Sequence, residues 1–189
     1  MLTFDPIPHE YRFNGVRVPS VTEILRPLSD FSGIPAAVLE AKRDLGQRVH
    51  LACQLDDEGD LDESSVEDDV APYLAAWRKF LVQSGAKVVL NEQRVYEPAL
   101  RYAGTVDNVL LLNGHKWVVD KKTSIATPLS ASAQTSAYLR ALNDPTVTRR
   151  AVVRLRPDGA YRFDSLTGVD DWTAFISCFN LWTYKETHA

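Results

Sequence analysis

The segment that most constrains the fold runs from Tyr102 to Lys122, YAGTVDNVLLLNGHKWVVDKK, where two strand-like apolar runs flank Asn113-Gly114. An Asn-Gly pair between such runs is the strongest short-range signal for a β-hairpin, because both central residues of a type I′ turn need positive φ. A two-residue turn at this pair places Asp107 opposite Asp120. Opposed residues of an antiparallel pair project from the same face, with Cβ atoms roughly 5 Å apart. The sequence therefore predicts two adjacent carboxylates.

Two carboxylates held this close repel each other unless a cation lies between them. Lys122 follows Asp120 by two positions on the same strand, so its side chain points to the same face. Oxygen ligands favour hard divalent cations, so we expect Mg²⁺ or Mn²⁺ to bind between the carboxylates. The same geometry also fits a solvated patch in which Lys122 neutralises the acids.

The 189 residues, 45% of them hydrophobic and 24% charged, predict a globular protein with its own core and a single domain over residues 1–189. The net charge of −4 argues against a globally basic surface. However, residues 56–69 hold nine of the 25 acids, so the rest of the chain is net positive and is compatible with a local basic surface. The acidic run lacks the ligand spacing of an EF-hand and is interpreted as a solvated loop and helix start.

Cys53 and Cys178 fit neither a CxxC metal pair nor a disulfide framework, which favours a reducing compartment and a role as small core residues. No apolar run approaches the ~18 residues needed to span a bilayer, and the first residues lack the pattern of a signal peptide. We therefore expect a soluble, cytoplasmic protein.

The order of local signals predicts a sheet with helices on its faces. The crossover from the central hairpin through a helix to the next strand requires parallel pairing, so we expect an α/β (α+β) fold with a mixed β-sheet flanked by helices. The expected elements are a hairpin at 11–18 turning at Asn14-Gly15, a Ser20–Glu23 capping box, helices at 35–55, 70–85, 128–143 and 168–184, an edge strand ending at Pro98, and a hairpin turning at 157–159.

Several other polar residues have more than one interpretation. His50 lies on the helix at 35–55, where an isolated histidine is commonly a surface or core residue. Gln134 and Tyr138 share one helix face and can either bind a phosphate or complete the core. Glu92 is either a third acid near a metal or an exposed strand residue, and we favour exposure.

The strand before the last turn carries four cations. Alternation places Arg150, Arg154 and Arg156 on one face and Arg149 on the other. The face with three arginines is the candidate contact for a nucleic-acid backbone, although strand arginines are also ordinary solvated residues.

The separate signals form an ordered series. His50, Gly104-x-x-Asp107, Asp120-x-Lys122 and Gln134-xxx-Tyr138 reproduce the H, GxxD, DxK, QxxxY pattern, and the chain thereby resembles the RecB-like branch of the PD-(D/E)XK nuclease superfamily. The segment YRFNGVRVPSVTEIL also resembles the opening of small phage-type exonucleases of that branch. The resemblance implies a restriction-endonuclease-like core with an N-terminal hairpin and a helical extension.

The resemblance also implies residue roles. His50, Asp107 and Asp120 would be metal ligands, Lys122 the catalytic amine with a pKa depressed by the metal, and Gln134 and Tyr138 would orient the substrate or that lysine. The chain departs from the pattern at Lys121, where an apolar residue is usual, and alternation turns this side chain to the opposite face. It also lacks the four cysteines of relatives that hold an iron–sulfur cluster, so no cluster is expected.

The function that follows is a Mg²⁺- or Mn²⁺-dependent deoxyribonuclease, specifically a phage or prophage DNA exonuclease that cleaves phosphodiester bonds with a metal-activated water. DNA is the expected partner, and a phage recombination or replication protein is a candidate second partner. An endonuclease of the same fold, or a nucleic-acid-binding or regulatory protein that no longer cuts, are the alternatives.

Overall fold

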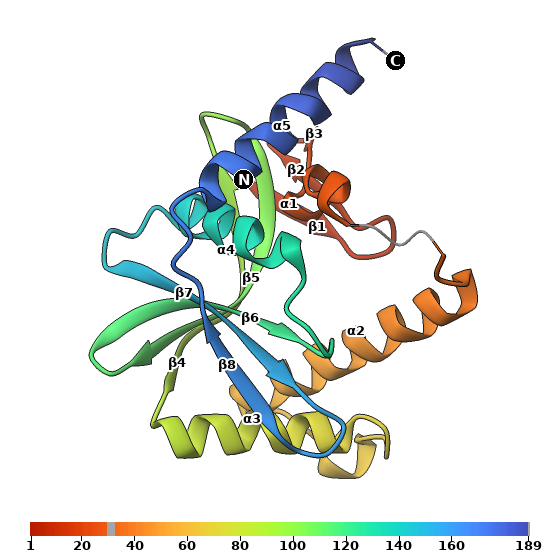
Figure 1. The fold of residues 1–189 in the computed structure, drawn as a ribbon, viewed down its shortest axis with the longest axis vertical. Coiled ribbons are helices and arrows are strands. Elements are labelled where there is room, and N and C mark those ends of the chain that lie inside the picture. The colour runs from red at the N-terminus through yellow and green to blue at the C-terminus, as the bar shows by residue number, and fades with distance from the viewer. Residues whose placement is uncertain (30–32, 189) are drawn as a thin grey trace.

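The computed structural model describes residues 1–29 and 33–188 and has two β-sheets with helices around them (Figure 1). The small sheet has the order β1-β2-β3, from β1 (Leu2–Asp5), β2 (Glu10–Phe13) and β3 (Val16–Val18). The large sheet has the order β4-β5-β6-β7-β8, from β4 (Lys87–Glu97), β5 (Tyr102–Leu112), β6 (His115–Lys122), β7 (Val147–Leu155) and β8 (Tyr161–Ser165). The helices are α1 (Val21–Ile24), η1 (Arg26–Leu28), α2 (Ala36–Glu58), η2 (Glu63–Ser65), α3 (Ala71–Ser84), α4 (Leu129–Leu142) and α5 (Asp171–His188).

The large sheet is mixed, as predicted, because β6 and β7 pair in parallel while the other neighbours are antiparallel. Helix α4 makes the crossover between the two parallel strands. The edge position predicted for β4 is confirmed by the strand order. The expected α+β architecture, a mixed sheet flanked by helices, is therefore the observed one.

Apolar side chains of the large sheet alternate between two cores. Leu110 and Val119 pack with Trp77 and other residues of α2 and α3, whereas Val109 and Val118 pack with α4 and α5. The strands are thus buried on both faces, which is why their sequences are almost continuously apolar. The same alternation determines which polar residues of these strands share a face.

The central hairpin has the predicted register. Asn113 and Gly114 have φ of 50° and 75°, and the ladder runs from Leu112↔His115 to Asn108↔Val119. The regular pairing ends there. One step further, Asp107 accepts a hydrogen bond from the main-chain N–H of Lys121 at 2.7 Å, so the two strands remain tied beside the carboxylates.

The N-terminal region contains the predicted hairpin and one strand that was not predicted. Asn14 and Gly15 turn the chain from β2 to β3, and the Ser20 hydroxyl caps α1 by accepting from the Glu23 N–H at 3.0 Å. Strand β1 adds to the other side of β2. The small sheet packs against β4, where the Phe13 and Tyr96 rings stack with centroids 3.9 Å apart.

The interpretation of residues 56–69 as solvated is wrong at its start. Helix α2 continues through Glu58 to a left-handed Gly59, and the Asp57 side chain is only 1% exposed, accepting a hydrogen bond from the Trp77 indole. A carboxylate so placed is tolerated because it has partners. Cys53 and Cys178 are buried and unpaired, as expected. Across the described parts of the chain, no helix has the length and apolar character needed to cross a membrane.

Candidate functional site

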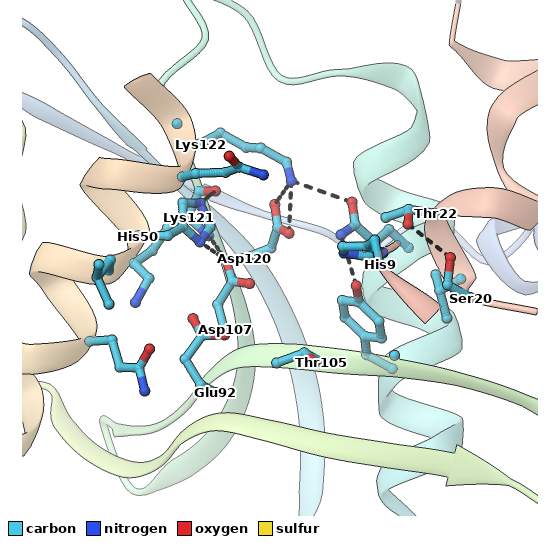
Figure 2. Close-up of a pocket in the computed structure, with 18 of the residues that line it drawn as sticks. His9, Ser20, Thr22, His50, Glu92, Thr105, Asp107, Asp120, Lys121 and Lys122 are labelled. Atoms are coloured by element: carbon cyan, nitrogen blue, oxygen red, sulfur yellow. Dashed lines mark hydrogen bonds and ion pairs between the residues drawn. The ribbon is translucent and has the colours of Figure 1, made fainter. Parts of the chain in front are cut away.

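A cavity of about 670 Å³ opens over the middle of β4 and β5 and the end of β6, between α2 on one side and the small sheet and α1 on the other (Figure 2). All of the residues for which catalytic or metal-binding roles were expected line this one cavity. They are His50, Asp107, Asp120, Lys122, Gln134 and Tyr138. The structure therefore brings together side chains that span almost ninety positions of sequence; their roles stay predictions.

Asp107 lies between two other acids. On the β6 side, Asp107 lies one position before Asn108, where the regular pairing with β6 ends. On the β4 side, the pairs Asn91↔Asn108 and Gln93↔Val106 place Glu92 opposite it. Glu92 has a φ of 45°, in the left-handed region that is unusual for a residue with a side chain. A third carboxylate thus joins the pair that the hairpin register predicted.

The favoured interpretation of Glu92 as an exposed strand residue is wrong. Its side chain lines the cavity, and its Oε1 atom is buried with no hydrogen-bond partner among the described residues. Burial, followed by the negative charge of Asp107, raises the pKa of Glu92 to about 8. The sequence signal that was missed is the strand register across the four-residue connection from β4 to β5, which no turn motif specifies.

His50 reaches the acids from α2 and has a defined tautomer. Its Nε2 lies 2.9 Å from the main-chain oxygen of Lys121, which can only accept, so Nε2 carries the proton and Nδ1 has the free lone pair. Nδ1 is 3.5 Å from Oδ2 of Asp107. Burial, and further the charges of Lys121 and Lys122, lower the pKa of His50 despite the opposing effect of Asp107. A neutral imidazole with an open nitrogen is the form that binds metals.

Asp120 and Lys122 form the other half of the site. The Lys122 ammonium lies 2.9 Å from the carboxylate of Asp120 and 3.4 Å from Oε1 of Gln134. Burial raises the pKa of Asp120 to about 7, although the Lys122 charge opposes this. Burial alone would lower the pKa of Lys122, but the charges of Asp120 and Asp107 outweigh it and raise the pKa. The depressed pKa expected beside a metal stays a prediction for the metal-bound protein.

Gln134 and Tyr138 orient one another on α4. The Gln134 amide donates to the Tyr138 hydroxyl at 3.1 Å, which leaves its oxygen facing Lys122. The Tyr138 ring occupies the space above Gly104, where a Cβ atom would lie 2.6 Å from Cε1 of the ring. The glycine of the GxxD motif is therefore needed for close packing, three positions before Asp107.

Lys121 points to the opposite face, as alternation predicted, and is fully buried there. Its ammonium lies 4.0 Å from the Asp57 carboxylate and 5.0 Å from the centroid of the Trp77 ring. Its main chain holds both Asp107, through N–H, and His50, through C=O. A side chain anchored in one core thus fixes the backbone that positions two groups in the cavity.

Two of the three arginines on the candidate face for a nucleic-acid backbone are engaged in ion pairs within the protein. Arg150 donates to Asp171 and to main-chain oxygens of Ser132 and Gly168, and Arg154 pairs with Asp164. Their side chains are only 10% and 11% exposed. Of the three, Arg156 alone is exposed. Alternation identified the shared face, but acids on β8 and α5 neutralise it.

The residues that could hold a divalent cation form two overlapping sets. His50, Glu92 and Asp107 each offer one ligand atom, and these three atoms lie within 4.8 Å of one another. The expected set of His50, Asp107 and Asp120 shares two of these residues, while Asp120 is bound to Lys122. Carboxylate oxygens with one imidazole suit Mg²⁺ or Mn²⁺, and the orphaned Glu92 oxygen fits such a guest.

Comparisons with known proteins give no family assignment. No family model matches the chain, and no curated protein matches it. Among solved structures, the chain is similar to one described as the crystal structure of SSO0001, with 15% sequence identity and a TM-score of 0.36 over 70% of this chain and 68% of that one. A likeness this distant carries no argument about function.

Proposed function

We propose that the protein is a metal-dependent deoxyribonuclease of the PD-(D/E)XK type. The observation that carries the proposal is the position of Asp107 between the half-buried Glu92 and the buried Asp120, with a neutral histidine on one side and a lysine on the other. Three acids packed this closely repel one another, and the Lys122 ammonium lies against Asp120, so a cation bound beside Asp107 and Glu92 would stabilise the fold. The ordered H, GxxD, DxK, QxxxY series includes all of these residues except Glu92.

The residues present fit a divalent cation. Asp107 would be the shared ligand, His50 would contribute Nδ1, and Glu92 and Asp120 would flank it from the neighbouring strands. When bound, Mg²⁺ or Mn²⁺ supplies Lewis acidity, which lowers the pKa of a water and offsets the charge that gathers on a phosphate under attack.

The remaining groups orient the attack. Lys122 points its ammonium into the cavity beside Asp120, where it can hold the attacking water in line and stabilise negative charge on the phosphate. Gln134 and Tyr138 restrict the position of that ammonium through the chain of contacts from Tyr138 to Gln134 to Lys122. Direct attack by water needs no nucleophilic side chain, so no covalent intermediate is involved.

We propose that DNA ends are the substrate, because the resemblance is to exonucleases of phage and prophage type, which act in recombination and replication. An endonuclease with the same residues remains the alternative. Degradation of linear DNA with circular DNA left intact would support an exonuclease, whereas nicking or linearisation of circular DNA would favour the alternative.

The test is release of nucleotides from end-labelled DNA with Mg²⁺ or Mn²⁺, compared with chelator. Lys122→Ala should lower the rate by at least about 100-fold, the range for removing one group that stabilises transition-state charge, while unfolding stays cooperative. Lys79→Ala, at an exposed lysine on α3, is the matched control and should retain the wild-type rate. Near-full turnover by Lys122→Ala would refute the assignment, and binding without hydrolysis by the wild type would favour the non-cutting alternative.

A further inference from the structure

The cavity has an aromatic wall that the proposed hydrolysis does not use. Phe4 on β1, Tyr11 on β2 and His9 in the turn between these strands line the side that faces away from α2. The His9 ring meets Phe4 edge-on at 5.1 Å between centroids and Tyr11 at 5.9 Å, and Phe4 and Tyr11 lie 4.6 Å apart. Three rings are thus gathered beside a cluster of acids.

The aromatic wall is held in place by contacts with β4 and β5. Tyr11 is 2% exposed, and its hydroxyl lies 2.8 Å from that of Thr105, two positions before Asp107 on β5. The Arg94 guanidinium lies over the Phe4 ring at 5.5 Å from its centroid. The wall is therefore attached to the strands that carry the acids, and its position relative to Asp107 is set by the fold.

His9 is the member of the wall that this packing does not require. It is exposed, and its φ of 52° places it in the left-handed region at the turn before β2. Phe4 and Tyr11 contact each other directly, so they form the core of the small sheet without it. Unusual backbone conformations cluster at ligand sites, and here one holds an exposed ring at the rim of a cavity. His9 is therefore the ring of the wall that is free to contact a ligand.

The opposite wall is cationic. Lys42, Arg43 and Gln47 are exposed on α2 and line the same cavity, one to two turns before His50. Figure 2 shows His50 and α2 on one side of the acids, with Ser20 and Thr22 of the N-terminal region on the other. A chain entering the cavity would therefore meet positive charge on one side and aromatic rings on the other.

We propose that the cavity admits a single DNA strand, with one base stacked on His9 and the flanking phosphates directed to Lys42 and Arg43. This inference rests on the proposed function for its placement of the scissile phosphate at Asp107. Aromatic rings with a basic track are the elements that bind single strands, because every base has a π-face. In a duplex the neighbouring base pairs cover those faces, so His9 reaches a base only when the strand is unpaired or frayed at its end.

The cavity size agrees with one strand. A volume of about 670 Å³ is typical of a site that takes one small ligand, and it is therefore compatible with a single nucleotide. The acids lie at the floor of this space, where Asp120 is 1% exposed. A phosphate must therefore leave the regular surface of a duplex to reach them.

The test is the affinity for a fluorescein-labelled single-stranded oligonucleotide and for the duplex of the same sequence, both in chelator at low salt. His9→Ala should weaken single-strand binding by at least about fivefold, the lower end of the effect of removing one stacked ring, and leave duplex binding unchanged. His115→Ala, at an exposed histidine beyond the cavity, is the matched control. A 2-aminopurine at the stacked position should lose fluorescence on binding the wild type but not His9→Ala.

The cationic wall is tested through the salt dependence. Lys42→Ala combined with Arg43→Ala should reduce the slope of log affinity against log salt by about one to one and a half, because two phosphate contacts to a single strand are lost. Lys79→Ala should leave the slope unchanged.

The outcomes separate this inference from the proposed function. Single-strand binding that depends on His9 in a protein that never hydrolyses DNA would support the aromatic wall and refute the nuclease. Metal-dependent hydrolysis by His9→Ala at the wild-type rate, with equal affinities for single strand and duplex, would refute the aromatic wall and leave the nuclease standing.

Discussion

Glu92 gives the sharpest prediction, because it is a half-buried acid whose Oε1 atom has no hydrogen-bond partner among the described residues. Replacing it with glutamine keeps its size and removes its charge. Moving the pKa of Glu92 from an ordinary 4.5 to about 8 corresponds to at most ~5 kcal/mol of destabilisation at high pH. Partial exposure and screening by water reduce this to about 1–3 kcal/mol. Glu92→Gln should therefore stabilise the metal-free protein at pH 8.

The sign of the pH dependence follows from the raised pKa. A carboxyl group with a higher pKa in the folded state favours folding when it is protonated, below about 4.5, and this contribution is lost as pH rises through about 8. The advantage of Glu92→Gln over the wild type should be almost absent at pH 5 and complete above pH 8. For a chain of this length it corresponds to a rise in Tm of about 2–12 °C.

The measurement is thermal unfolding of both proteins at pH 5 and pH 8, in chelator and with Mn²⁺. Mn²⁺ should raise the Tm of the wild type at pH 8 and raise that of Glu92→Gln much less, because losing a ligand weakens metal binding by at least about tenfold. Glu40→Gln, at an exposed acid on α2, is the control and should shift stability by less than about 0.5 kcal/mol. An equal Mn²⁺ effect on both proteins, or a destabilised Glu92→Gln at pH 8, would refute the reasoning.

Two further predictions concern the packing that positions the site. Gly104→Ala should lower the free energy of unfolding by about 1–3 kcal/mol and slow hydrolysis, because its Cβ would displace the Tyr138 ring. Chemical denaturation measures the first effect and the nuclease assay the second. Unchanged values in both would contradict the close contact. Lys121→Met should lower the free energy of unfolding by about 3–5 kcal/mol, because it leaves the buried Asp57 without its cationic partner, and adding Asp57→Asn should recover most of this loss. Urea denaturation of the single and double variants measures the coupling. Additive losses would contradict an interaction between the two side chains.

Local signals predicted most of the elements and one side of the site. The Asn113-Gly114 turn fixed the register of β5 and β6, and with it the positions of Asp107 and Asp120, because a two-residue turn leaves no freedom in the pairing. Alternation then placed Lys122 with the acids and Lys121 behind them. These inferences succeeded because each depends only on residues close together in the chain.

The remainder depended on contacts between distant segments. Glu92 joins Asp107 through a strand register that no short turn specifies, and its left-handed backbone is stable only within the folded sheet. The alternation of Arg150 and Arg154 was read correctly, yet Asp171 and Asp164 neutralise them from other elements. His9 and His50, forty-one positions apart, meet the same cavity only once the small sheet and α2 have packed on opposite sides of it. Spacing along the chain thus determines which side chains share a strand face, whereas the packing of whole elements decides which of those faces meet and which charges stay free.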